Sequence, residues 1–360
     1  MTDKSQHPPK KQPVSVPKAP DLMSDVYSDP FHSQRSNFAL IKLLRPHQWT
    51  KNLFCFAGVI FGGRLFQLDA IAQGAITVVL FCAIASAVYI FNDIQDFERD
   101  RRHPKKRFRP IASGQVRIKT AVLIAIFLAT LALLGAYHLG WQTFTLVLLY
   151  AINNIIYSTG LKNVLLFDVG CIAFGFVLRL LAGIYVLGDM PTAWIVLCTF
   201  SLTLFLGFAK RRTELLALLS HPMHQELRDY QESSSIQNPL STLHRSYLKL
   251  FYQRGHVNKQ RPVLAQYTLP FLDSMLNSTA TLTVMCYALF TIISDKNPSL
   301  VITVPIVYYA VMHYKWMVTV LAIGEEPDKI LREDHGIKLS LIIWLIAYLT
   351  IVYCDIRLFI

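Results

Sequence analysis

The sequence predicts an all-α polytopic membrane protein, and three observations carry that prediction. Hydrophobic residues make up 53% of the 360 positions and charged residues only 16%, whereas charged residues reach about 25% in a typical soluble domain. The mean hydropathy is positive, at +0.38. The apolar residues gather in blocks of about 20, the length that crosses the bilayer core as a helix. These features exclude a water-soluble globular domain.

Nine apolar blocks follow one another along the chain, and each is long enough to span a bilayer when helical. The first six come before residue 210 and end at charged or turn-forming residues, and the last three follow a long polar segment. The sequence thus predicts a bundle of nine transmembrane helices. In order, the predicted spans are residues 50–66, 70–91, 118–138, 141–158, 164–187, 192–209, 268–293, 299–320 and 338–354.

The basic residues predict the orientation of these spans. If the N-terminal tail is cytoplasmic, it shares a side with the loops that hold nearly all Lys and Arg residues, as the positive-inside rule requires. The exceptions are Arg64, Lys296 and Arg357 on the other side, and Arg179 inside the fifth span. The same placement explains the net charge of +12, so we expect a lipid bilayer and no nucleic acid as its partner. The loops on the basic side are residues 92–119, 157–163, 208–267 and 313–338.

The polar segments outside the spans divide the chain into two regions. Residues 1–38 are polar and rich in Pro, which predicts a disordered cytoplasmic tail. Residues 39–360 form the membrane domain, with a cytoplasmic insertion at about 219–262. The six cysteines lack metal-ligand spacing and lie in or beside apolar blocks, so we expect buried thiols and no disulfide framework. Whether the chain forms a homo-oligomer is left open.

Three aspartates close the second span in the stretch NDIQDFERD. On a helix, Asp93, Asp96 and Asp100 fall within about 60° of one another, with Asn92 beside them. Three carboxylates on one face repel each other unless a cation is bound, and hard oxygen ligands suit Mg²⁺. The alternative is a solvated acidic turn. The deeply apolar span before it, where charges are costly, favours the metal site.

A run of basic residues follows the aspartates and supplies the complementary charge. Lys105, Lys106, Arg107 and Arg109 lie directly after the predicted metal face. Arg forks bind phosphate in bidentate fashion and Lys acts as a point charge. Topology alone would explain several of these residues. Carboxylates, a divalent cation and phosphate-binding cations together predict a diphosphate site.

Further charged and polar residues lie on the same membrane side, in three short motifs. Arg179 is an exception, because it lies well inside the fifth span, where an ionisable residue is a functional hypothesis by default. A buried ion pair is the alternative for Arg179. Asp168, near the start of that span, would pair with a neighbouring cation or reach the reacting centre. The other residues are Arg45 and Lys51 in RPHQWTKN, Tyr157 and Lys162 in YSTGLKN, and Lys210, Arg211, Arg212 and Glu214 in KRRTEL.

These motifs resemble the UbiA superfamily of intramembrane prenyltransferases. NDIQDFERD matches its aspartate motif, NDxxDxxxD, at Asn92, Asp93, Asp96 and Asp100. The order of RPHQWTKN, HPKKRFRPIASG, YSTGLK, FVLRLLAG, KRRTEL and GEEPDKILREDH is similar to the decaprenyl-phosphate phosphoribosyltransferase branch, which makes the lipid-linked phosphoribose used for cell-wall arabinan. The likeness runs over roughly residues 41–358 and is interrupted by the insertion.

The resemblance implies a helix bundle in a bacterial inner (plasma) membrane, with the N-terminus and the active site facing the cytoplasm. It implies transfer of phosphoribose from phosphoribosyl diphosphate to a polyprenyl phosphate, with Mg²⁺ as cofactor and diphosphate as the leaving group. Asn92, Asp93, Asp96 and Asp100 would hold the metal. The implied substrate-binding residues are Lys51, Lys106, Arg107 and Arg109 for the donor, Lys162, Arg179, Lys210 and Arg211 for the acceptor or the far donor phosphate, and Arg45, Asn92, Tyr157, Asp168 and Glu214 beside them.

One departure from the wider superfamily bears on the substrate. Aromatic prenyltransferases carry a second aspartate motif near the cytoplasmic end of the sixth span, where this chain has KRRTEL. Cations in that place favour a direct phosphate clamp over a second metal. Two alternatives remain: a prenyltransferase that moves an isoprenoid to an aromatic or other acceptor, and a non-catalytic carrier of polyprenyl phosphates. The carrier would need no carboxylate triad.

Overall fold

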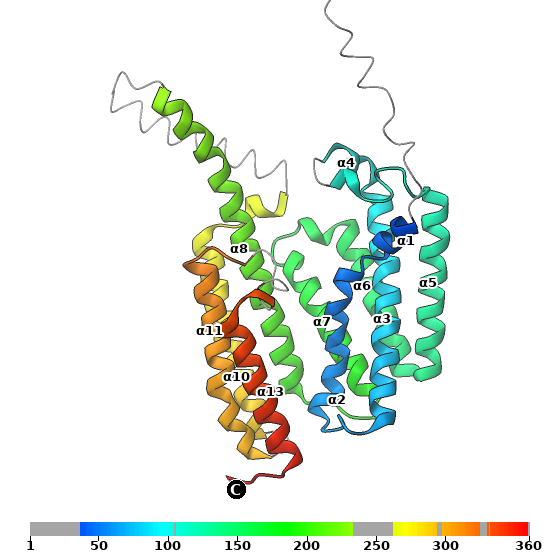
Figure 1. Ribbon diagram of the computed structural model, residues 1–360, viewed down its shortest axis with the longest axis vertical. Coiled ribbons are helices and arrows are strands. Elements are labelled where there is room, and N and C mark those ends of the chain that lie inside the picture. The colour runs from blue at the N-terminus through cyan, green and yellow to red at the C-terminus, as the bar shows by residue number, and fades with distance from the viewer. Residues whose placement is uncertain are drawn as a thin grey trace, which may run out of the picture.

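The computed structural model describes residues 37–103, 106–232, 262–293, 297–324, 330 and 332–358, and Figure 1 shows their arrangement. The predicted tail therefore lies outside the described residues, apart from its last two positions. Most of the predicted insertion does as well. Its first residues extend a helix as far as Glu232.

The described residues form helices and connecting loops. The helices run roughly parallel to one axis, with α1 to α7 on one side of the view and α8 to α13 on the other (Figure 1). In chain order they are α1 (Asn37–Leu44), η2 (Pro46–Phe56), α2 (Ala57–Phe61), α3 (Leu68–Gln95), α4 (Phe97–Arg102), η3 (Lys106–Phe108), α5 (Ile118–Leu139), α6 (Trp141–Thr159), η4 (Leu161–Asn163), α7 (Phe167–Tyr185), α8 (Ala193–Glu232), η5 (Pro262–Gln266), α10 (Leu269–Ile293), η6 (Pro298–Thr303), α11 (Val304–Thr319) and α13 (His335–Tyr353).

Six helices in the described residues are long and apolar enough to cross a membrane: α3, α5, α7, α8 as far as Leu219, α10 and α13. The all-helical membrane fold is thereby confirmed. Two predicted spans are divided between elements: residues 50–66 between η2 and α2, and residues 299–320 between η6 and α11. Residues 141–158 form the continuous helix α6, as predicted, but this helix carries polar residues such as Asn153 and Asn154 and is not among the six. The number nine stays a prediction.

Burial separates a central helix from peripheral ones. In α7, 61% of the apolar window is buried inside the protein, against 11% in α5. Figure 1 accordingly shows α5 at the edge of the bundle. Helix α7 packs on α6, α8 and η2, so it joins the two groups of helices. Its side chains are therefore placed where segments from both groups meet.

Glycine lets η2 and α2 approach the backbone of α7. A Cβ atom on Gly183 would lie 1.8 Å from the carbonyl oxygen of Cys55, and one on Gly58 would lie 2.1 Å from that of Gly183. Only residues without a Cβ allow backbones this close. The close packing places Asn52 of η2 beside Arg179 of α7.

Candidate active site

The aspartate motif lies at a break between two helices. Helix α3 ends at Gln95, Asp96 adopts φ −91° and ψ 9°, and α4 begins at Phe97. The amides of Asp96 and Asp100 still donate to the carbonyls four residues earlier, so the chain bends without losing these bonds. We expected one continuous helical face for the three carboxylates. The break at Asp96 divides them instead.

Two carboxylates of the motif share one arginine. The Nη1 atom of Arg109 lies 3.0 Å from Oδ1 of Asp93 and 2.6 Å from Oδ2 of Asp100. Arg45 pairs with the same Oδ1 of Asp93, from a position before η2 where its backbone is left-handed (φ 54°). Both carboxylates are buried. Buried carboxylates need such partners, because an isolated charge is costly in a medium of low dielectric.

The third carboxylate faces outward. Asp96 Oδ1 lies 3.5 Å from Nζ of Lys162 in η4 and 3.7 Å from Nη1 of Arg99. Asp96 also lines a cavity of about 420 Å³, together with Gln95, Glu98, Arg99 and Arg102. In this motif, therefore, the carboxylate of Asp96 is partly exposed at an open cavity, whereas those of Asp93 and Asp100 are buried.

The residues fit a hard divalent cation, although they are not gathered around one. Within the described residues, no three His, Cys, Asp or Glu side chains converge as metal ligands. The position between Asp93 and Asp100 is taken by the Arg109 nitrogen. The side-chain Oδ1 of Asn92 is buried and has no hydrogen-bond partner among the described residues. Carboxylates are the protein ligands that Mg²⁺ usually takes, together with waters and substrate phosphates, and an amide oxygen is a hard donor as well.

A second cluster joins α7, α8 and the residues after η5. Arg211 donates from Nε to Oδ2 of Asp168 at 2.6 Å and from Nη1 to Oε2 of Glu214 at 2.6 Å. The hydroxyl of Tyr267 donates to Oδ1 of Asp168 at 2.6 Å. Burial, and next the hydrogen bond to Asp168, raise the pKa of Tyr267 above its ordinary value. The phenol therefore stays a neutral donor.

This cluster changes the interpretation of KRRTEL. We expected both Lys210 and Arg211 to clamp a phosphate. The side chain of Arg211 is only 2% exposed and contacts two carboxylates, whereas that of Lys210 is 42% exposed and lies 4.0 Å from Glu214. Arg212 pairs with Asp273 at 2.6 Å. Lys210 is thus the member of this motif that faces outward, whereas Arg211 is buried and paired with Asp168 and Glu214.

The two clusters lie at the same end of the bundle and meet at η4. Lys162 of η4 contacts Asp96, and the carbonyl of the next residue, Asn163, accepts a hydrogen bond from Gln266 of η5. Tyr157, at the end of α6, is within electrostatic range of Arg211. Figure 1 places α4, which carries Asp100 of the aspartate motif, at the end toward which α8 extends. These contacts bring loops far apart in the sequence to one polar face.

Arg179 is buried below this face and has neutral partners. It donates to Oδ1 of Asn52 at 2.8 Å, to the carbonyl of Gly175 at 3.1 Å and to the hydroxyl of Tyr150 at 2.7 Å. Its guanidinium also lies over the rings of Tyr150 and Phe176. Among the described residues it has no carboxylate partner, so the ion pair that we considered for Arg179 does not form there. Within the described part of the chain, its positive charge therefore has only neutral partners in the apolar interior.

Three other predicted residues lie at the periphery of this face. Lys51 donates to Oε1 of Gln48 in the same 3₁₀ helix, at 2.6 Å. The guanidinium of Arg107 lies over the ring of Phe108. Lys106 and Arg107 are both exposed in η3.

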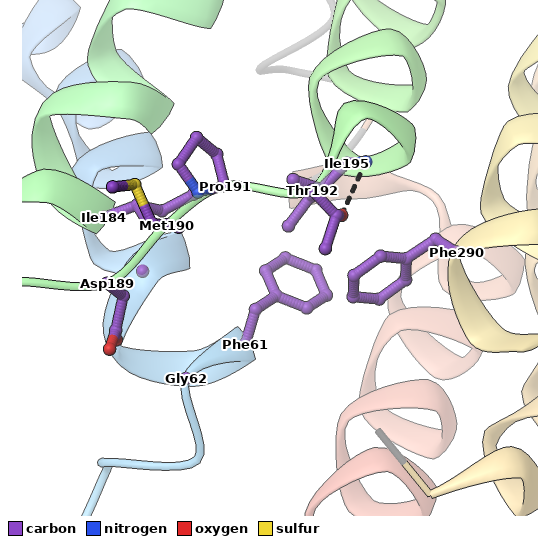
Figure 2. Close-up of a pocket in the computed structure, with 10 residues that line it drawn as sticks. Phe61, Gly62, Ile184, Asp189, Met190, Pro191, Thr192, Ile195 and Phe290 are labelled. Carbon is purple, nitrogen blue, oxygen red and sulfur yellow. Dashed lines mark hydrogen bonds between the residues drawn. The ribbon is translucent and has the colours of Figure 1, made fainter. Parts of the chain in front are cut away.

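A second cavity lies at the opposite end of the bundle. Its volume is about 260 Å³, and its walls include Phe61, Ile195 and Phe290. Figure 2 shows the two phenylalanine rings beside each other, while the carboxylate of Asp189 points away from them. Asp189 pairs with Arg64 at 2.5 Å. This cavity lacks the clustered cations that a diphosphate requires.

Residues 52–214 match the UbiA prenyltransferase family. The chain contains a UbiA-family domain. The UbiA domain ends at Glu214, so it includes the aspartate motif, Arg179 and the KRRTEL motif except its last residue. Tyr267 lies after it and Arg45 before it. The resemblance inferred from the motifs is thereby confirmed.

Similarity to known proteins extends over most of the chain. The chain is 28% identical over 321 residues to a protein of Mycolicibacterium smegmatis named decaprenyl-phosphate phosphoribosyltransferase, covering 85% of this chain and 90% of that protein. A protein of the same name from Corynebacterium glutamicum is 29% identical over 324 residues, covering 87% and 86%. Together with the family match, these similarities indicate a membrane-embedded transferase.

A solved structure confirms the fold of the UbiA domain. The chain superposes on a UbiA homologue from Archaeoglobus fulgidus bound to GPP and Mg²⁺ with a TM-score of 0.61. The superposition covers 88% of this chain and 99% of that one, at 18% sequence identity. At this sequence identity the structural similarity establishes the fold alone.

The sequence did not predict three residues that contact the predicted site residues. Tyr267, Asn52 and Tyr150 each donate to or accept from a predicted charged residue. Asn52 could have been found, because it follows Lys51 in the motif RPHQWTKN. Tyr150 and Tyr267 are single tyrosines in long segments, and no pattern in the sequence distinguishes them.

Proposed function

We propose that this protein transfers phosphoribose from phosphoribosyl diphosphate to a polyprenyl phosphate, with Mg²⁺, at the cytoplasmic face of a bacterial inner membrane. The observation that carries the proposal is the near full-length similarity to proteins named decaprenyl-phosphate phosphoribosyltransferase. The polar face of the bundle supports it, because it combines carboxylates with the cations that two phosphate substrates need. Nine transmembrane spans with a cytoplasmic N-terminus remain part of this proposal.

Asn92, Asp93, Asp96 and Asp100 would hold the metal, with Asp96 nearest the open cavity. When bound, Mg²⁺ supplies Lewis-acid chemistry by neutralising charge that develops on the departing diphosphate. Arg45, Arg109 and Lys162 already lie on these carboxylates. They are the cations best placed to bind the donor phosphates, with Lys106 and Arg107 on the adjacent η3.

The acceptor phosphate oxygen would attack the anomeric carbon of the donor as the bond from that carbon to the diphosphate oxygen breaks. No general base is required, since a phosphate monoester is already anionic. Lys210 is exposed beside Glu214 and would bind the acceptor phosphate. Arg179, which has neutral partners among the described residues, would contribute a positive charge from the interior, where low dielectric strengthens its field. Positioning and electrostatics then provide most of the rate.

A product assay tests this function directly. Purified protein, Mg²⁺, phosphoribosyl diphosphate labelled in the ribose and a panel of polyprenyl phosphates should give a labelled lipid. Asp93→Asn keeps the shape of the side chain but removes a predicted metal ligand. We expect it to lower turnover by about 10²–10⁴-fold, as for loss of one electrostatic group in a site, while the protein still inserts.

Three results would contradict the proposal or part of it. Transfer of an isoprenoid from prenyl diphosphates to an aromatic acceptor, without any labelled lipid from phosphoribosyl diphosphate, would favour the aromatic prenyltransferase. Movement of polyprenyl phosphate across vesicles in the presence of EDTA, with no covalent product, would favour the carrier. Near-normal turnover of Asp93→Asn at saturating Mg²⁺ would remove the aspartate motif from the metal site.

A further inference from the structure

We propose that Arg109 is an exchangeable counter-ion of the aspartate motif. In the metal-free protein it holds Asp93 and Asp100, and it transfers to the donor phosphates when the donor and the metal bind. Metal and oxyanion would then bind cooperatively, each weakly without the other. This inference rests on the proposed function, because it assigns a metal to the same carboxylates.

The geometry supports exchange because one nitrogen serves both carboxylates. Nη1 of Arg109 contacts Oδ1 of Asp93 and Oδ2 of Asp100, which lie seven residues apart on either side of the break at Asp96. Arg45 contacts the same oxygen of Asp93. A cation that joins Asp93 to Asp100 must compete with this guanidinium for the same oxygens.

Arg109 can leave this position without breaking a helix. It lies in the connection between η3 and α5, and its side chain is 29% exposed, whereas those of its two carboxylate partners are each 2% exposed. The buried partners are therefore fixed, and the exposed partner is the one with room to move. A guanidinium released from a carboxylate keeps its planar fork, which matches a phosphate equally well.

Charge balance gives the exchange its direction. Two buried carboxylates without a cation would be costly, so Arg109 is retained until another cation arrives. A divalent cation without an oxyanion would displace Arg109 into a site that lacks a partner for it. An oxyanion that binds Arg109 removes this penalty. By linkage, the oxyanion and the metal must strengthen each other's binding by the same factor.

The test measures metal binding without turnover. Mn²⁺ serves as the probe, and the loss of its free-ion signal in electron paramagnetic resonance reports binding to detergent-purified full-length protein. Arg109→Gln should bind Mn²⁺ at least about tenfold more tightly than the wild type, within the usual range of coupling between sites. The matched control is Arg117→Gln. Arg117 is exposed at the start of α5 and forms no ion pair within the described residues.

Sulfate tests the oxyanion half of the proposal. Excess sulfate, compared with chloride at equal ionic strength, should tighten Mn²⁺ binding to the wild type several-fold. In Arg109→Gln it should change binding by less than about twofold, because no guanidinium remains to be transferred. If Arg109→Gln is not recovered as folded protein, Arg45→Gln replaces it, and tighter Mn²⁺ binding is again expected.

Three outcomes would overturn the inference: equal Mn²⁺ affinity of wild type and Arg109→Gln, an equal gain in Arg117→Gln, and no effect of sulfate on the wild type. The double variant Asp93→Asn/Arg109→Gln separates this failure from that of the proposed function. If the double variant binds Mn²⁺ more weakly than Arg109→Gln does, Asp93 is a metal ligand, whatever the result for Arg109. If it binds as Arg109→Gln does, Asp93 is not a ligand, and the metal assignment falls with the inference.

Discussion

Arg211→Leu would remove the cation from a fully buried carboxylate. The side chain of Asp168 is 0% exposed and that of Arg211 is 2% exposed, with 2.6 Å between Nε and Oδ2. Removing one partner of a buried ion pair costs about 3–5 kcal/mol, because the other charge stays buried without compensation. The hydrogen bond from Tyr267 persists, so we expect the free energy of unfolding to fall by about 3–4 kcal/mol within that range.

Unfolding of the purified protein in mixed micelles, followed by far-ultraviolet circular dichroism, measures this loss. Arg212→Leu is the matched control on the same helix. Its partner Asp273 is 40% exposed, so the variant should lose only about 1 kcal/mol. Adding Asp168→Asn to Arg211→Leu removes the orphaned charge. It should recover about 1–3 kcal/mol, as expected for residues in contact.

Arg211→Lys distinguishes a positioning role from a phosphate clamp. A lysine keeps the charge but has no fork to reach both Asp168 and Glu214. A positioning residue would show lower stability and KM values for both phosphate substrates within about twofold of the wild type. Unchanged stability in Arg211→Leu, combined with a raised KM for one phosphate substrate in Arg211→Lys, would refute the positioning role and restore the clamp.

Three further predictions concern packing, the acceptor and the tail. Gly183→Ala places a Cβ 1.8 Å from the carbonyl oxygen of Cys55, so it should lower the free energy of unfolding by about 1–3 kcal/mol. The control Gly170→Ala, whose Cβ would have nothing within 4 Å, should not lower it. Equal stability of the two variants would contradict the close packing. Lys210→Ala should raise the KM for polyprenyl phosphate about tenfold through loss of a point charge, with the Mg²⁺ dependence unchanged, and an unaltered KM would remove Lys210 from the acceptor site. Deleting residues 1–36, which lie outside the described residues, should leave activity within about twofold, and a folded but inactive truncation would show that the tail contributes to the site.

The positions of the long helices could be predicted from the sequence, because a segment inside a lipid bilayer must form its backbone hydrogen bonds internally. The predicted spans 118–138 and 268–293 agree closely with α5 (Ile118–Leu139) and α10 (Leu269–Ile293). In a bilayer every backbone polar group must be bonded internally, so a long apolar block becomes a helix almost regardless of its neighbours. The location of the aspartate motif at the end of α3 was predictable for the same reason. The 3₁₀ form of residues 46–56 was not predicted, and this segment packs against α7 where Gly183 meets Cys55.

The partners of the charged residues were decided by tertiary structure. From the sequence, Asp93, Asp96 and Asp100 are equivalent members of one motif, and Lys210 and Arg211 are equivalent members of another. The fold separates Asp96 from Asp93 and Asp100 through a break in the helix, and it buries Arg211 while leaving Lys210 exposed.

The physical reason is the range of the interactions. Helix formation depends on bonds between residues four positions apart, and local composition therefore determines it. The ion pairs of the site join residues 48 positions apart for Arg45 and Asp93, and 43 apart for Asp168 and Arg211. A carboxylate accepts any cation that packing brings within reach. The sequence by itself determined which chemical groups reach the polar face of the bundle, and only the packing of η2, α7 and α8 decided which of them neutralise each other and which face a substrate.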